Sequence, residues 1–260
     1  MSEYDYQSQG KISLSAPQNG SINKLAGGSN IQGGDNYTAF FINYDENNIA
    51  ESSVSDATNV KIHAVANTNL TVSKGRGNTY YADRNFTFLN GTGKTYAEVN
   101  GNYSIFGQDG LNLTLEAFAD DGIVINNAGN TILQASNSTA KMTLWGYPND
   151  DASSTILAFG GKSANSFISG KGMNIYSGGD GKNVFSMYKN ICENGTTLIL
   201  NFNQDTDYID VSQIIDKNSF VNLLRISKNV NGNAFIELET HTLILVGILL
   251  ENINIDRFSF

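Results

Sequence analysis

Residues 160–186 read as three consecutive nonapeptides: GGKSANSFI (160–168), SGKGMNIYS (169–177) and GGDGKNVFS (178–186). Glycine recurs among the first four places of each block, asparagine fills the sixth place and an aromatic residue the eighth. Glycine allows the positive φ of a tight turn, and a short strand after such a turn points its large apolar side chain inward. Repetition at a fixed short period predicts stacked coils of β-structure.

The three blocks resemble the repeats of the RTX family, in which Gly-Gly-x-Gly-x-Asp-x-(large apolar)-x units build a parallel β-roll. The resemblance implies that two nonapeptides complete one coil. It then places Asn165 and Asn183 on one edge, Asn174 on the other edge, and Phe167 stacked on Phe185 inside. The residues expected to form this repeat ladder are Asn165, Asn174, Asn183, Phe167, Tyr176 and Phe185.

The sixth place of the blocks departs from the RTX pattern. RTX repeats bind calcium through an aspartate in that place together with carbonyls of the glycine-rich turn, and calcium prefers carboxylate oxygens. Asparagine offers only a neutral oxygen. We therefore expect weakened or absent calcium binding, no other cofactor or metal ligand, and turns held by hydrogen-bonded asparagine side chains.

Most of the remaining chain shows short alternating stretches separated by turn signals such as Asn90-Gly91 and Asp121-Gly122. We expect an all-β fold, a parallel β-roll or β-solenoid with a C-terminal β-rich secretion region. Three degenerate copies of the turn are expected at 90–95, 107–112 and 126–131. The one expected helix begins near 212 or 218 and includes 221–224.

Three units are expected along the chain: an N-terminal β region at 1–85, the roll at 86–190 and a C-terminal region at 191–260. The first unit shows no repeat in its sequence and is expected to be a cap or a separate β element. The roll is clearest at 160–186.

The last seventy residues resemble the C-terminal region of type I secretion substrates. Leu198–Ser212 is similar to a strand that follows the repeats in such proteins, with Asn201 in place of its leading aspartate. The chain ends on an acidic residue and an aromatic-rich stretch: Asp256, Arg257, Phe258, Ser259 and Phe260. The resemblance implies a secretion signal read by a type I transporter, and a location outside a Gram-negative cell or on its surface. The alternative is an ordinary β-domain whose last strand happens to end Phe-Ser-Phe.

Composition excludes several classes of protein. The net charge of −9, from 25 acidic and 16 basic residues, argues against nucleic acid or an anionic membrane as a partner. The longest apolar run, 243–250, is far short of the roughly 20 residues of a membrane span, so we expect no membrane insertion. The N-terminus lacks the basic and apolar regions of a cleavable signal peptide. The single Cys192 excludes an internal disulfide.

No catalytic constellation is evident. The two histidines, His63 and His241, lie far apart and do not form His-Glu-x-x-His, and Gly-x-Ser-x-Gly is absent. Cys192 has no histidine partner nearby in the sequence. The pairs Asp120-Asp121 and Asp150-Asp151 fall at expected turns, where solvated aspartate is common. We therefore expect no catalytic residue and no enzymatic activity.

The sequence favours a secreted, non-enzymatic structural protein that assembles with itself, as a surface-layer, matrix, filament or adhesin subunit. Its expected partners are further copies, the transporter and a cell-surface glycan. The alternative is a polysaccharide-binding or polysaccharide-modifying β-solenoid, which an acidic cleft around Trp145, Tyr147 and Asp150 would favour. A third hypothesis is a small-ligand carrier that uses His63 or a tyrosine at an open pocket.

Overall fold

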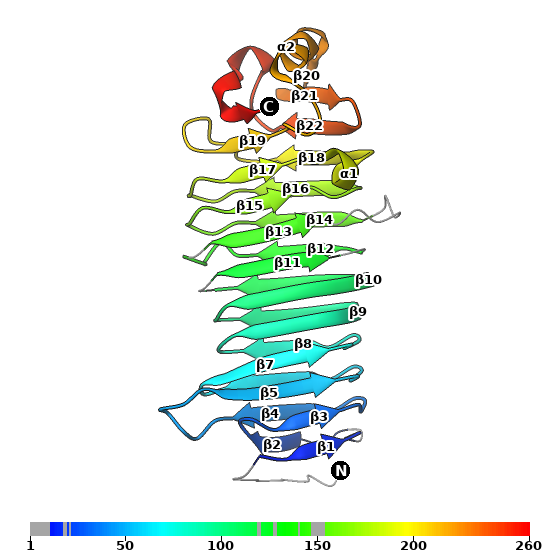
Figure 1. Ribbon diagram of the computed structural model, residues 1–260, viewed down its shortest axis with the longest axis vertical. Helices are drawn as coiled ribbons and strands as arrows, with labels where there is room; N and C mark the ends of the chain where they lie inside the picture. The colour runs from blue at the N-terminus through cyan, green and yellow to red at the C-terminus, as the bar shows by residue number, and fades with distance from the viewer. Residues whose placement is uncertain are drawn as a thin grey trace.

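The chain winds into a tall rod of stacked β-coils (Figure 1). The computed structural model describes residues 11–17, 20, 22–118, 121–126, 129–139, 141–146 and 154–260. Nearly every strand pairs in parallel with the strand two further along the chain, so two ladders of strands face each other across a common core. The expected all-β parallel solenoid is confirmed.

The first ladder is made of one strand or half-strand from each coil. In spatial order it contains β1 (Ser13–Ser15), β3 (Asn30–Gln32), β5 (Ala50–Ser55), β7 (Thr68–Ser73), the first parts of β9 (Phe86–Val99) and β10 (Tyr103–Ala117), β11 (Gly122–Asn126), β13 (Met142–Gly146), β15 (Ser166–Ile168), β17 (Val184–Ser186), β19 (Tyr208–Asp210) and β23 (Phe258–Ser259).

The second ladder alternates with the first along the chain. It contains β2 (Ile22–Ala26), β4 (Thr38–Ile42), β6 (Lys61–Val65), β8 (Thr79–Ala82), the second parts of β9 and β10, β12 (Thr131–Gln134), β14 (Thr155–Phe159), β16 (Met173–Ser177), β18 (Gly195–Ile199) and β22 (His241–Leu245), followed by the antiparallel β21 (Asn233–Leu238) and β20 (Lys228–Val230).

The ladders explain the coil length. Ser166 pairs with Val184, a separation of 184 − 166 = 18 residues, so one coil spans two nonapeptides in this part of the chain. Elsewhere the coils vary, because Thr38 pairs with Lys61 and Lys61 with Thr79. Two of the expected degenerate turns, 90–95 and 107–112, lie within the continuous strands β9 and β10, where Asn90 and Gly110 have positive φ. The third, 126–131, lies partly outside the described residues.

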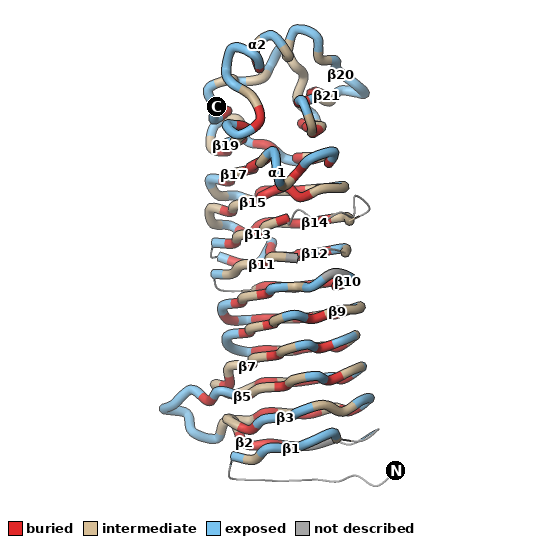
Figure 2. Tube along the Cα trace, turned by 45° about the vertical axis from the view of Figure 1, so that its right-hand side comes forward, coloured by how far each residue is buried: buried red, intermediate tan, exposed pale blue. Residues whose placement is uncertain are grey.

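Buried residues alternate with more exposed ones along most strands (Figure 2), so alternate side chains point into the core. The first ladder contributes at least one large inward residue per coil, and one such residue from each coil stacks in register from one end of the rod to the other. This core column is Leu14, Ile31, Val54, Val72, Phe88, Ile105, Val124, Leu144, Phe167, Phe185, Ile209 and Phe258. A continuous apolar core of this kind is the main stabilising feature of a solenoid.

The ladders continue across residues 85 and 190, the expected boundaries between units. β7 and β8 both pair with β9, and β16 and β17 pair with β18 and β19. Residues 11–85 therefore contribute strands to the same two ladders as the rest of the rod.

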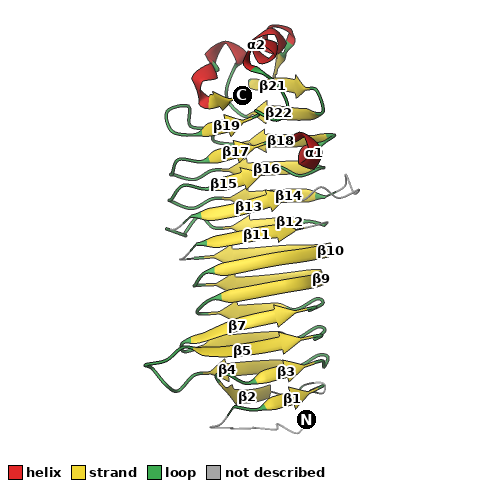
Figure 3. Ribbon diagram, in the orientation of Figure 1, coloured by secondary structure: helices red, strands yellow, loops and turns green. Residues whose placement is uncertain are grey.

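A cap covers the C-terminal end of the rod (Figure 3). It contains α2 (Lys217–Ile226), the antiparallel strands β20 and β21, and two short 3₁₀ helices, η1 (Leu250–Asn252) and η2 (Ile255–Arg257). The expected helix is thus present, with Asp216 as its N-cap. A further four-residue helix, α1 (Lys189–Cys192), was not predicted. Among the described residues, no helix is long and apolar enough to cross a membrane.

Candidate functional site

A buried row of polar side chains joins the coils at one edge of the rod. Asn165, Asn183 and Asp207 each precede a strand of the first ladder (β15, β17 and β19), and none is more than 2% exposed. The backbone N–H and Nδ2 of Asn165 donate to Asn183 Oδ1 at 3.1 and 3.0 Å. Those of Asn183 donate to Asp207 Oδ1 at 2.9 and 3.0 Å. We call these three residues the Asn–Asp row.

Each amide of the row also binds the turn before it. Asn165 Nδ2 lies 3.3, 2.8 and 2.8 Å from the carbonyl oxygens of Gly161, Ser163 and Gly178. With Asn183 Oδ1 it therefore has four oxygen neighbours. Turn carbonyls and a sixth-place side chain are the kinds of group that RTX repeats present to calcium, and here an uncharged donor satisfies them.

The glycines of these turns make room for the amides. A Cβ on Gly178 would lie 2.5 Å from Asn183 Nδ2, and one on Gly160 would lie 2.8 Å from Asn165 Nδ2. Gly179 has a φ of +83°, which side chains rarely allow. Glycine and asparagine therefore recur together in the repeat, because the asparagine amide occupies the space that a side chain at the glycine would need.

Asp207 ends the row and was missed in the sequence. Its Oδ1 accepts the two Asn183 donors and its Oδ2 accepts the backbone N–H of Asn203 at 2.9 Å. Only a carboxylate has acceptors on both sides, so an asparagine at 207 would turn its NH₂ group towards one of these N–H donors. The spacing in the sequence could have identified it, because Asp207 stands two residues before the inward Ile209, as Asn183 stands two residues before the inward Phe185.

Asn174 lies on the other edge, apart from the row. Its Oδ1 accepts the Gly170 N–H at 3.1 Å and its Nδ2 donates to the Gly170 carbonyl at 2.9 Å, so it closes its own turn. Its neighbours in register are Ile156 and Thr197, so Asn174 itself has no asparagine partner in the adjoining coils.

Asn78 links two adjacent coils in the N-terminal half of the rod. Its Oδ1 accepts the Val60 N–H at 3.0 Å, and its Nδ2 donates to the Ala57 carbonyl at 3.0 Å and to the Tyr80 hydroxyl at 2.6 Å. This residue was also missed, although Asn78-x-Tyr80 has the spacing of Asn174-x-Tyr176.

The predicted aromatic residues lie together in the core. The rings of Phe167 and Phe185 are 5.2 Å apart and nearly parallel, and Tyr176 of the second ladder lies 4.9 Å from Phe167. All three side chains are fully buried. They stabilise the coils and present no surface to a ligand.

The C-terminal residues predicted as a secretion signal belong to the cap. Phe258 is the last member of the core column, and Phe258 and Phe260 both pack on Phe220 of α2, with ring centroids 4.7 and 5.2 Å away. Arg257 Nη1 donates to the Tyr208 hydroxyl at 3.0 Å. The Asp256 N–H donates to Asn254 Oδ1, and Ser259 pairs with Asp210 of β19.

The two histidines are far apart in space as well. The His63 ring is stacked between Phe40 and Tyr81 on the outer side of the second ladder, with centroids 4.5 and 4.6 Å away. Partial burial, followed by the charge of Lys61, lowers its pKa. Both ring faces are covered, which disfavours a role in holding a flat ligand.

His241 lies in a buried polar chain between the cap and the coils. Its Nδ1 is 2.8 Å from the Cys192 carbonyl, which only accepts, so Nδ1 carries the proton. Its Nε2 is 2.8 Å from Thr197 Oγ1, which is 2.7 Å from Ser169 Oγ. Burial lowers the pKa of His241 to about 4 and raises that of the Cys192 thiol to about 12.

The proposed acidic cleft is only partly described. Trp145 is half-buried on β13, and its register neighbours are Ile125 and Ile168. Tyr147 and Asp150 lie outside the described residues, as do Asp120 and Asp151. Within the described part of the chain, no group of three or more His, Cys, Asp or Glu residues is arranged to hold a metal ion.

The outer side of the second ladder carries a row of apolar residues that was not predicted. These residues face solvent on six successive strands and stand opposite one another in register. This apolar row is Ile132, Leu157, Ile175, Leu198, Ile244 and Phe235.

The surface around the middle of the apolar row is also uncharged. Beside it lie Met173 and Leu200, which are 41% and 37% exposed, while Ile132 of the row is 43% exposed. On β14, β16, β18 and β22, which are fully described, no outward side chain is charged. In a chain with a net charge of −9, this surface is set apart from the charged edges.

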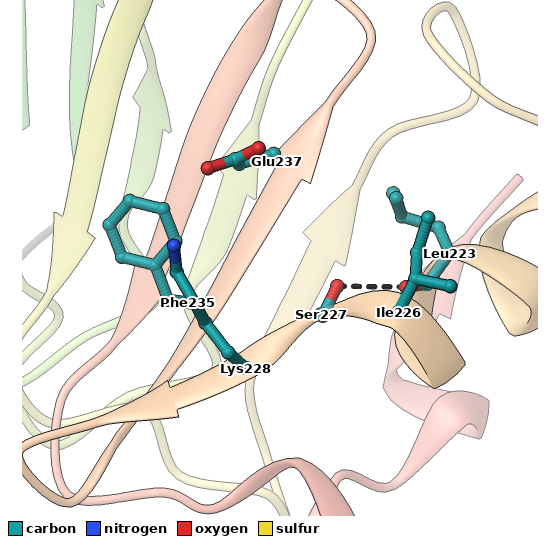
Figure 4. A pocket seen from close by; sticks show the side chains of 6 residues that line it. All are labelled: Leu223, Ile226, Ser227, Lys228, Phe235 and Glu237. Atoms are coloured by element: carbon teal, nitrogen blue, oxygen red, sulfur yellow. Dashed lines mark hydrogen bonds between the residues drawn. The ribbon is translucent and has the colours of Figure 1, made fainter.

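The apolar row ends at a small open pocket on the cap (Figure 4). The pocket has a volume of about 170 Å³ and is lined by Leu223, Ile226, Ser227, Lys228, Phe235 and Glu237. Lys228 Nζ lies 5.3 Å from the centre of the Phe235 ring, and Ile226 is 81% exposed. The apolar surface therefore extends from the coils onto the cap.

Comparison with known proteins adds no relative: no family model matches the chain, and no curated protein is significantly similar to it.

Proposed function

We propose that this chain is a secreted, non-enzymatic structural protein that associates with further copies of itself on the outside of a bacterial cell or in the extracellular matrix. The observation that carries this proposal is the uncharged apolar surface on a rod whose charged residues lie largely at its edges and ends. Contiguous exposed apolar surface on a water-soluble fold marks interaction sites.

The rod itself suits such a role. Its backbone is hydrogen-bonded from coil to coil, and buried amides are hydrogen-bonded within the best-formed turns. A rod built in this way keeps its shape whether or not calcium is present. Self-association is therefore expected to be independent of calcium.

Export by a type I transporter is part of the proposal and rests on the resemblance of the C-terminal region. Residues 256–260 complete the core column and the cap, so they are the last part needed to close the rod. A secretion signal at this end fits a chain that is exported unfolded and folds afterwards.

Association is tested by sedimentation velocity and negative-stain electron microscopy of the full chain, with millimolar calcium and with a chelator. Calcium-independent assemblies are expected. Monomers at all concentrations would overturn the structural role and lead to glycan arrays and lyase assays. Export is tested by expressing the chain beside a type I transporter, with and without residues 256–260, and measuring the amount in the medium.

A further inference from the structure

The apolar row has the dimensions of a small protein–protein interface. It crosses six strands, which at about 4.8 Å each gives roughly 29 Å along the rod, and strands of five residues are roughly 17 Å wide. The flat area is thus about 500 Å² per copy, or about 1,000 Å² for two copies, which is the lower limit for a specific interface.

A second copy of the chain is the partner that this surface fits. Two such faces have the same spacing between rungs, so outward side chains of one can lie in the grooves of the other, as in packed β-sheets. Each copy carries a charge of −9, and only an uncharged face lets two copies meet without burying like charges.

The direction of the two rods follows from the charged residues near the row. Glu98 and Glu116 point outward on strands next to the row, and Glu237 points outward beside Phe235 on β21. In a parallel pair each would lie at the same level of the rod as its own copy. In an antiparallel pair centred on the row, Glu237 of β21 lies opposite the neutral Asn130, which precedes β12, and the two N-terminal halves point away from each other.

We propose that two copies associate face to face through the apolar row, with the rods antiparallel and a two-fold axis between β16 and β18. Ile175 of each copy then packs on Leu198 of the other, Leu157 on Ile244, and Ile132 on Phe235. The proposal rests on the self-association proposed above and names its surface and geometry.

The C-terminal cap argues against end-to-end growth as the main mode. Phe220, Phe258 and Phe260 cover the end of the core, and Asn229 of the last strand β20 is hydrogen-bonded to Leu250 and Glu251 of η1. A core end covered in this way offers no open apolar layer on which another coil could stack.

Cross-linking tests the geometry. The only native cysteine, Cys192, is buried and has a raised pKa, so an introduced surface cysteine is the reactive one. Full-length Ile175→Cys and Leu198→Cys proteins are oxidised separately and as a mixture. Disulfide-linked heterodimers are expected to exceed both homodimers in the mixture. Equal or greater homodimer formation, or no cross-linking, would overturn the antiparallel pairing.

Substitution tests the surface. Leu198→Lys places a charge at the centre of the interface and is expected to weaken the dimer at least tenfold in sedimentation velocity. Ile175→Lys serves as the second variant, and circular dichroism checks that both fold. Phe106→Lys is the matched control, because Phe106 is a 38% exposed apolar residue on the outer side of the first ladder.

The outcomes separate the two proposals. In one outcome, the unaltered chain associates and Leu198→Lys and Ile175→Lys both leave that association unchanged. In another, only Phe106→Lys abolishes it. Either result would refute this interface and leave the structural role standing. A chain that stays monomeric before any substitution would refute both.

Discussion

At the scale of single residues, the Asn–Asp row determines whether the turns need ions. Asn183 is neutral, so it can lie against the Asp207 carboxylate and the Gly181 carbonyl by donating to both, at 3.0 and 3.1 Å. A carboxylate at 183 would face the same oxygens without a proton to share. Asparagine at this place therefore supplies a hydrogen-bond donor where a carboxylate would need a cation.

Asn183→Asp is expected to destabilise the chain without calcium and to create calcium dependence. In chelator, the buried pair of carboxylates at 183 and 207 should lower the free energy of unfolding by on the order of 3 kcal/mol. Added calcium should restore most of this loss, because it can bind both carboxylates and the turn carbonyls. Thermal unfolding with and without calcium measures both effects.

The control for this variant is Asn102→Asp, at an exposed edge where the side chain does not face Asp207. It should change stability little and respond weakly to calcium. An unaltered chain that is itself strongly stabilised by calcium would contradict the view that amides replace ions in the row.

Because of His241, the free energy of unfolding is expected to fall as the pH is lowered. Its pKa is about 4 when folded and about 6.5 when unfolded, so both states are neutral above pH 6.5 and the full stability is present there. As the pH falls from about 6.5 to about 4, the unfolded state gains a proton and the folded state does not, which costs about 3 kcal/mol. Urea unfolding at about pH 7 and about pH 4.5 measures the loss.

The comparison variant is His241→Gln, which keeps the carboxylates unchanged. It should be less stable at neutral pH, because the Cys192 carbonyl and Thr197 lose a well-placed partner. Its further loss on acidification should be smaller than that of the unaltered chain by about 2–3 kcal/mol. An identical acid loss in both proteins would show that His241 is not the group responsible.

At the scale of secondary-structure elements, β23 and α2 close the core. Phe258→Ala removes the last member of the core column, and a buried Phe→Ala change costs about 3–5 kcal/mol. Because coils contact only their neighbours, hydrogen exchange should rise mainly in β19, β22 and α2 and much less in β4–β8. Ser259→Ala, at the exposed position next to it, is the control. Uniformly faster exchange along the rod would contradict this local effect.

The elements could be predicted where coil length is constant. At 160–186 every turn has the same glycine–asparagine–aromatic spacing, and the structure places those residues on two edges and in one core. The N-terminal coils gave no such pattern, because Thr38, Lys61 and Thr79 are in register but separated by 23 and 18 residues. Strand pairing fixes which residues stand opposite one another and leaves the turns free to vary in length.

At the scale of the whole molecule, the inside and outside of the rod are hard to distinguish from the sequence. Ile156 points into the core and Leu157 points outward, and the same holds for Leu243 and Ile244. Such runs are uniformly apolar, so the period-two alternation that normally separates the two faces is lost. The outer apolar row emerged only from the register of the strands, and this is why no interface was predicted.

The proposed dimer is expected to strengthen with salt. Two copies of charge −9 repel each other, and raising the salt from about 20 to about 300 mM shortens the range of that repulsion to less than about 10 Å. The apolar row contributes no ion pairs that salt could weaken. Sedimentation velocity across this range should therefore show dissociation constants that fall severalfold. Dissociation on adding salt would mean that charged edges, rather than this face, hold the copies together.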